Sequence, residues 1–137
     1  MSTLHLSIVT PEKELLSEDI DEVIVPTTNG EVTILPEHAA LLAEIFPGEL
    51  VIKRGGKSEH LVVVGGFLEV GKNTVTVLAD YAVSGKDISE AAAQQAKDRA
   101  EKAMKEKKSD VDFATAEAEF RRAILELKVA KRQKGIH

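Results

Sequence analysis

The segment 66–73, Gly-Phe-Leu-Glu-Val-Gly-Lys-Asn, comes closest to a known catalytic motif in this chain. It nearly satisfies the G-x-x-x-x-G-K-[ST] pattern, in which backbone amides and the start of a helix hold nucleotide phosphates. The segment ends in Asn73, however, and strand-like sequence at Phe67–Val70 and Thr74–Leu78 occupies the places of the loop and the helix. We therefore predict a strand followed by a Gly-Lys-Asn hairpin turn, and not a nucleotide-binding loop.

The remaining chemically active side chains form no catalytic or metal-binding pattern. His5 and His60 lie in strand-like sequence, His137 is the last residue, and a polar contact accounts for His38 in its loop as well as chemistry does. The chain has no cysteine, which excludes thiolate metal sites, cysteine nucleophiles and disulfides. A G-x-S-x-G serine motif is also absent. We predict that the protein is not an enzyme and holds no metal.

Cationic side chains gather near the C-terminus. Six of the residues 121–137 are basic, against the single acid Glu126. Over the whole chain the net charge is −5, but residues 1–84 carry −8 and residues 85–137 carry +3. The cations either complement the dipole of a solvated helix or form a docking surface for an acidic partner. A nucleic-acid partner is not predicted, because the chain is acidic, has five aromatic residues and shows no recognition motif.

Length and composition describe a small globular protein. The 137 residues, 43% of them hydrophobic, suit one ordinary domain or a small domain with an appendage. No apolar run reaches the roughly 18–20 residues that span a bilayer, so we predict no direct membrane insertion. The first residues lack the basic and apolar regions of a secretory signal, and the absence of cysteine fits a reducing cytoplasm.

The elements that position these residues fall into two regions. Residues 1–84 contain short runs rich in β-branched residues, separated by turn sequences that include Gly65-Gly66. No segment between them is long enough for a crossover helix. We predict an all-β antiparallel sandwich, with strands at Leu4–Val9, Ile20–Val25, Glu31–Leu35, Glu49–Arg54, His60–Val64, Phe67–Val70 and Thr74–Leu78.

Residues 85–137 predict a two-helix hairpin. The first helix has Asp87 or Ser89 as its cap, the second has Asp110 or Asp112, and Lys107-Lys108 separates them. Gly135 marks the end of the second helix. Spacings of three and four residues place one set of side chains on the packed face of each helix. These are Ala92, Ala96, Ala100 and Ala103 in the first, and Phe113, Ala116, Phe120, Ala123, Ile124, Leu127 and Ala130 in the second. Such a hairpin depends on packing against the sandwich or a partner, and can be released from the sandwich at modest cost.

Several segments, taken together and in order, resemble the epsilon subunit of bacterial F-type ATP synthase. They are Thr10-Pro11-Glu12, the stretch 29–42 (NGEVTILPEHAALL), the stretch 65–70 (GGFLEV), the stretch 75–80 (VTVLAD), 110–113 (DVDF) and Arg121-Arg122-Ala123. The resemblance runs from about Leu4 to Lys134. It implies a non-catalytic rotor subunit of the central stalk, which couples proton flow through the c ring to ATP synthesis.

The resemblance also implies partners and the residues that contact them. The gamma subunit and the c ring are expected to contact the sandwich at Glu31, His38, Leu41 and Leu42. The hairpin is expected to extend into the alpha and beta subunits and inhibit ATP hydrolysis, with its basic face on an acidic surface of a beta subunit. That face consists of Arg121, Arg122, Lys131 and Arg132. The implied location is the cytoplasmic face of the cell membrane, as a peripheral part of the complex.

Some members of that family bind ATP at the hairpin through an [IL]-D-x-x-R-A motif. Here the matching residues include Ile88 and Ala93, but Ser89 replaces the aspartate and Ala92 replaces the arginine. Glu126 stands where the ATP-binding members carry a second arginine. Because these changes remove two cations and add a carboxylate, we predict weak or absent ATP binding and no cofactor.

Two other functions fit parts of the sequence. The chain can be read as a generic β-sandwich adaptor whose basic helical arm binds some other acidic protein. It can also be read as a small nucleotide hydrolase that uses segment 66–73, which the turn-like sequence disfavours.

Overall fold

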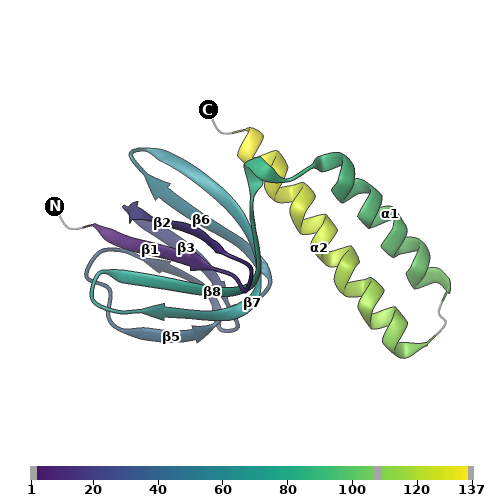
Figure 1. Ribbon diagram of the computed structural model, residues 1–137, viewed down its shortest axis with the longest axis horizontal. Coiled ribbons are helices and arrows are strands. Elements are labelled where there is room, and N and C mark those ends of the chain that lie inside the picture. The colour runs from purple at the N-terminus through teal and green to yellow at the C-terminus, as the bar shows by residue number, and fades with distance from the viewer. Residues whose placement is uncertain (1–2, 107–108, 136–137) are drawn as a thin grey trace.

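The computed structural model describes residues 3–106 and 109–135 and shows a β-sandwich that carries a helical hairpin at one end (Figure 1). The two predicted regions are both present. The strands are β1 (Leu4–Val9), β2 (Glu14–Ile20), β3 (Glu22–Thr27), β4 (Gly30–Ile34), β5 (Leu41–Glu44), β6 (Gly48–Arg54), β7 (Lys57–Val70) and β8 (Thr74–Ser84). A 3₁₀ turn, η1 (Gly85–Asp87), leads to the helices α1 (Glu90–Glu106) and α2 (Asp110–Lys134).

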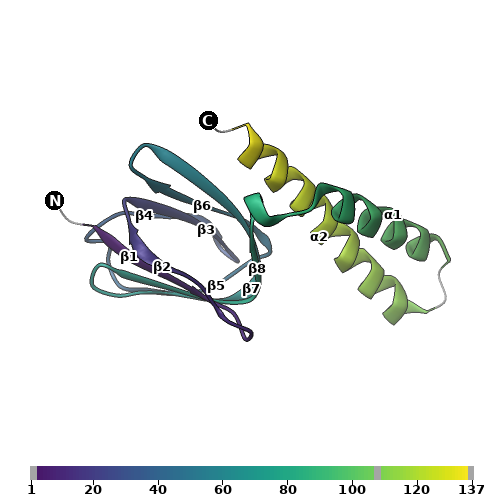
Figure 2. The same cartoon turned by 45° about the horizontal axis from the view of Figure 1, so that its top comes forward.

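Alternating side chains build the core of the sandwich. In β1, Leu4, Leu6 and Ile8 are fully buried, while His5 between them is exposed. The strands pair in the order β2-β1-β8-β7-β6-β3-β4, with β5 added on β7, and the sheet folds over into two layers (Figure 2). The main hydrophobic cluster is drawn entirely from residues 4–82. The sandwich therefore has a core that does not depend on the hairpin.

The strand pairing differs from the prediction in one respect. β1 and β8 are parallel, whereas the other pairs are antiparallel. No crossover helix is needed, because the whole sandwich lies in the chain between these two strands. The expectation of a purely antiparallel sheet was wrong for this pair.

Two strands were not predicted, and two predicted strands are one. β2 and β5 are additional, and β7 continues through Gly65-Gly66, which we had predicted as a turn. The first half of β7 pairs with β6 and its second half pairs with β5. The two glycines have φ values of 67° and 102°, so they bend the strand where it passes from one layer to the other.

This bend changes which residues of β7 face the core. Before it, Leu61 and Val63 are buried in the core, and after it Leu68 and Val70 are. Phe67 consequently points away from the core and is 54% exposed. The glycine pair thus determines which large side chains the sandwich presents on its surface.

Serine residues cap both helices. The Ser89 hydroxyl accepts a hydrogen bond from the Ala92 amide at 3.1 Å, and the Ser109 hydroxyl accepts one from the Asp112 amide at 3.0 Å. Ser89 was one of the two predicted caps of α1. Asp110 and Asp112 had been predicted for α2, but both lie inside its first turn. Gly135 follows the last residue of α2 as predicted, and Lys107-Lys108 lies outside the described residues.

The two helices pack through small residues. The buried side chains of α1 are Ala93 and Ala100, and those of α2 are Ala116, Ala123, Val129 and Ala130. The predicted face of α1 was therefore partly wrong, since Ala92 and Ala103 are exposed. In α2 the prediction was wrong for Ile124, which is 41% exposed.

Candidate functional site

One outer face of the sandwich carries large apolar side chains that have no cover. Leu42 on β5, Phe67 on β7 and Leu78 on β8 are 71%, 54% and 48% exposed. Phe67 lies opposite Leu78 in the strand register, and Leu42 lies opposite Glu69, two residues from Phe67. All three therefore point to the same side of the sheet. A hollow of about 520 Å³ beside Phe67 and Leu78 makes this face suited to receive a partner's side chains.

Of the four sandwich residues implied by the resemblance, Leu42 belongs to this face. Glu31 is exposed near the start of β4, whereas His38 follows the other end of β4, so the two are not brought together. The His38 ring nitrogen Nδ1 lies 2.7 Å from the Ala39 carbonyl oxygen, a polar contact within its own loop. Leu41 is half-buried and packs on the core, while its neighbour Leu42 is exposed.

The hairpin packs against the sandwich through α2, and α1 packs on α2 (Figures 1 and 2). Val129 of α2 is fully buried, and so is Val62 of β7, which lies outside the main core cluster. A side chain at Gly85 would lie 3.2 Å from the Val129 Cγ1 atom and 3.0 Å from the Gln133 Cβ atom. The last turns of α2 therefore sit closely on the hinge that follows β8.

Tyr81 on β8 connects the sandwich to the middle of α2. Its hydroxyl donates a hydrogen bond to Glu126 Oε1 at 3.0 Å, and the Arg122 guanidinium lies 4.5 Å from the centre of its ring. Burial, followed by the hydrogen bond and charge of Glu126, raises the pKa of Tyr81 above the usual value of about 10. The neutral phenol therefore stabilises the docked hairpin fully below about pH 10, the usual pKa of tyrosine. This stabilisation is lost as the pH rises through the raised pKa of Tyr81 in the folded protein.

A second polar cluster holds the C-terminal turns of α2. Arg132 pairs with Glu49 Oε1 on β6, and the other oxygen of Glu49 accepts a hydrogen bond from His60 Nδ1 at 2.9 Å. The His60 amide donates to Gln133 Oε1 at 2.7 Å. Of the four predicted docking cations, Arg122 and Arg132 therefore lie against the sandwich.

The other two predicted cations are exposed and form no ion pair with the described residues of the sandwich. Arg121 is highly exposed and, among the described residues, pairs with Glu117 one turn earlier in α2, at 3.5 Å. Lys131 is exposed, and no carboxylate among the described residues pairs with it. The predicted basic face is thus divided by the docked position of the hairpin.

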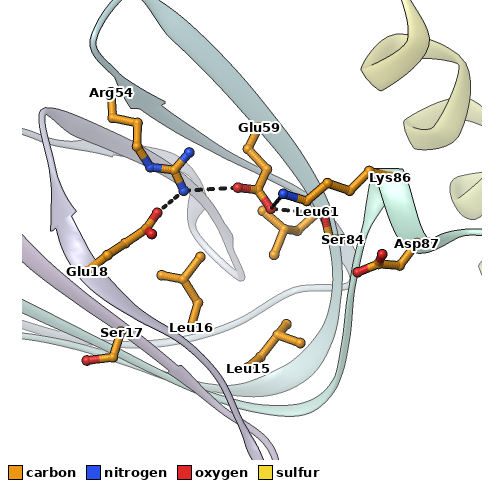
Figure 3. Close-up of a pocket in the computed structure, with 10 residues that line it drawn as sticks. All are labelled: Leu15, Leu16, Ser17, Glu18, Arg54, Glu59, Leu61, Ser84, Lys86 and Asp87. Atoms are coloured by element: carbon orange, nitrogen blue, oxygen red, sulfur yellow. Dashed lines mark hydrogen bonds and ion pairs between the residues drawn. The ribbon is translucent and has the colours of Figure 1, made fainter.

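The hinge itself is tied to the sandwich beside a cavity of about 450 Å³ (Figure 3). Glu59 on β7 is buried and accepts hydrogen bonds from Ser84 Oγ at 2.9 Å and Arg54 Nη2 at 2.9 Å. The Lys86 ammonium in η1 lies 3.7 Å from the same carboxylate. Arg54 also pairs with Glu18 on the facing strand. These charges balance one another, and the group fixes the start of the hinge.

No feature of the described residues assembles a catalytic centre. Phe67–Val70 belongs to β7 and β8 begins at Thr74, so the predicted hairpin turn is confirmed, with Asn73 at a φ of 55°. The residues at 3–106 and 109–135 contain no group of three potential metal ligands. His137 lies outside that range. Within the same residues, no helix is both long enough and apolar enough to cross a membrane.

Sequence reasoning missed several residues of this site. Phe67 and Leu78 were predicted as strand residues and Glu49 as a strand end, whereas Tyr81 lay beyond the last predicted strand. If the bend at Gly65-Gly66 had been recognised, the alternation of side chains along the strand would have predicted that Phe67 faces away from the core. The pair between Glu49 and Arg132 spans 83 positions and leaves no local signal.

Comparisons with known proteins identify the family. The model of the ATP synthase delta/epsilon chain β-sandwich domain matches residues 3–85, and that of the long alpha-helix domain of the same chain matches residues 86–131. Proteins named ATP synthase epsilon chain are similar over nearly their whole length. The one from Nitratidesulfovibrio vulgaris is 45% identical over 93% of this chain and 95% of its own, and the one from Nitrosococcus oceani is 42% identical over 95% and 94%.

Solved structures support the same fold. A chain in the mitochondrial ATP synthase of Euglena gracilis, in an OSCP/F1/c-ring structure, superposes with a TM-score of 0.77 at 20% identity, covering 96% of this chain and 81% of its own. A chain in the central stalk/c-ring structure of Tetrahymena thermophila gives a TM-score of 0.62 at 20% identity, over 93% and 96%. With both family domains matched in order and close relatives over more than nine-tenths of the chain, the protein belongs to the ATP synthase epsilon-chain family, whose members are non-catalytic stalk subunits of that complex.

Proposed function

We propose that the chain is a rotor subunit that couples proton movement through the c ring to ATP synthesis and inhibits ATP hydrolysis through its hairpin. The observation that carries this proposal is the match of both family domains, in order, over residues 3–131. The absence of an assembled catalytic centre in the described residues agrees with a mechanical and regulatory role. The complex is membrane-associated, and we place this subunit on its cytoplasmic face.

The exposed apolar face supports the proposed contact with the gamma subunit. Leu42, Phe67 and Leu78 are 71%, 54% and 48% exposed, and they lie together on one side of the sheet. Buried by a partner, such side chains become the anchors of an interface. We propose that this face binds gamma, with Leu41 and His38 at its edge and Glu31 toward the c ring.

The position of Glu126 supports the proposal that no nucleotide cofactor binds at the hairpin. Its carboxylate accepts the Tyr81 hydrogen bond and lies 3.5 Å from the Arg122 guanidinium. Arg122 therefore has a partner within the chain, and Glu126 adds negative charge where a phosphate would need cations. Ser89 caps α1, and Ala92 contributes only a methyl group.

A charge placed on the exposed face tests the gamma contact. Phe67→Asp should weaken binding of the chain to a complex of alpha, beta and gamma by roughly thirtyfold or more, because a carboxylate would be buried in an apolar interface. The variant should remain folded, since Phe67 is half-exposed in the isolated chain. Binding is measured by titration of a labelled chain into the complex.

Val111→Asp is the matched control for this test. Val111 is 74% exposed at the start of α2, outside the proposed face. The Val111→Asp variant should bind the complex of alpha, beta and gamma as tightly as the unmodified chain does. Equal binding by both variants would show that gamma docks elsewhere on the molecule.

A further inference from the structure

In the docked hairpin, some of the predicted docking cations are paired with the sandwich and others are not. Arg121 and Lys131 are exposed and form no ion pair with the described residues of the sandwich, while Arg132 is held by the sandwich carboxylate of Glu49. An acidic surface on a partner subunit would have to pair with the same Arg132 guanidinium. Glu49 and that partner therefore compete for one cation.

Glu49 is well placed for this competition. Its side chain is 14% exposed, whereas that of Arg132 is 50% exposed. His60 donates a hydrogen bond to the second oxygen of Glu49, which fixes the carboxylate toward α2. The acceptor is thus preorganised on a rigid strand, and the cation belongs to the movable element.

The surrounding contacts concentrate the strength of docking near this pair. Gln133 accepts a hydrogen bond from the His60 amide, and Val129 is buried against the hinge. α1 packs on α2 rather than on the sandwich. Release of the last turns of α2 would therefore remove this group of contacts, and the contacts of Tyr81 with Glu126 and Arg122 would remain to hold the middle of the helix.

We propose that Glu49 is an internal substitute for the acidic partner surface, which pairs with Arg132 in the docked hairpin and so restrains the hairpin from binding that partner. The proposal rests on the proposed function, because it assumes that the extended hairpin inhibits ATP hydrolysis. The partner that fits the released face is a cluster of carboxylates on a protein surface. Arg121 and Lys131 remain available to that cluster while Arg132 is still paired.

Glu49→Gln tests this proposal in the full chain. The amide oxygen can still accept the hydrogen bond from His60, but the charge that pairs with Arg132 is gone. The ratio of extended to docked hairpin should rise by roughly fivefold. ATP hydrolysis by the complex with alpha, beta and gamma should fall, since more hairpin is free to inhibit.

Tyr81 reports docking in the isolated chain. It is the only tyrosine, and the chain has no tryptophan, so the absorbance of tyrosinate on alkaline titration belongs to this residue alone. Docking raises its pKa through burial and Glu126. Glu49→Gln should lower the apparent pKa toward that of residues 1–84 alone.

Two further variants serve as a control and as a charge exchange. Glu14→Gln removes an exposed carboxylate from β2 and should behave as the unmodified chain in both assays. Exchanging the charges by Glu49→Arg with Arg132→Glu should restore docking in the titration, yet reduce inhibition, because the hairpin has lost a cation for its partner.

The outcomes separate this proposal from the proposed function. If Glu49→Gln matches Glu14→Gln in either titration or hydrolysis while removal of residues 85–137 still relieves inhibition, the role of Glu49 is wrong. If removal of residues 85–137 also leaves hydrolysis unchanged, the inhibitory function of the hairpin is wrong as well.

Discussion

Removing residues 85–137 should increase ATP hydrolysis by the reconstituted complex roughly fivefold or more, while the remaining sandwich stays bound. The main hydrophobic cluster lies within residues 4–82, and β8 ends at Ser84, so the truncated chain keeps its core. The exposed face with Leu42, Phe67 and Leu78 also remains. Only the element that carries the basic docking surface is lost. Hydrolysis is measured with alpha, beta and gamma, with and without residues 85–137.

Binding of the truncated chain must be confirmed in the same preparation. Sedimentation of the complex followed by quantification of the bound sandwich serves as the control. Unchanged hydrolysis by a complex that retains the sandwich would rule out inhibition by this hairpin, although the coupling role of the sandwich could stand.

Gly66→Ala should destabilise the sandwich by about 3 kcal/mol. Gly66 has a φ of 102°, and a Cβ atom there would lie 1.8 Å from the Leu78 carbonyl oxygen. Accommodating the methyl group requires the backbone pairing of β7 and β8 to open at the bend between the two layers. The free energy of unfolding is measured by chemical denaturation, followed by circular dichroism.

Gly56→Ala is the matched control for the strained glycine. Gly56 also has a positive φ, 78°, but no atom lies within 4 Å of the position of its Cβ. Its substitution should cost only about 1 kcal/mol, from backbone conformation alone. If both variants lost the same stability, close contact with β8 would not be the reason for glycine at position 66.

The strands that the sequence predicted are those whose own side chains alternate. β1 is the clearest case, because each second residue is a large aliphatic one. β2 and β5 are rich in leucine, glutamate and alanine, which have no strong preference for strands. They form strands because β2 pairs with β1 and β5 pairs with β7. Such pairing is a tertiary effect that a local pattern does not carry.

The α1 face was misplaced for a local reason. Three consecutive alanines, 91–93, allow more than one helical face at the same spacing, and the structure buries Ala93 instead of Ala92. The partner helix decides between them. Alanine alone gives too little contrast in side-chain volume to select the face.

The charge division of the sequence indicated part of the site. An acidic sandwich and a basic C-terminal region favour docking of one on the other, and the contact of Arg132 with Glu49 is one such pairing. Net charge could not identify the individual carboxylate, because residues from β6 and α2 meet only when the hairpin folds back. The same holds for Tyr81 and Glu126, which lie 45 positions apart.

A distance measured between sandwich and hairpin inside the assembled complex distinguishes the docked hairpin from the extended one. The chain has no cysteine, so Lys57→Cys and Lys134→Cys provide two unique and exposed positions for spin labels. In the docked hairpin they lie on either side of the contact between the His60 amide and Gln133. We expect a short distance from the docked hairpin and a longer one from the extended hairpin. The fraction of molecules with the longer distance should increase in proportion to the loss of ATP hydrolysis. A single short distance in a fully inhibited complex would show that inhibition does not require the hairpin to leave the sandwich.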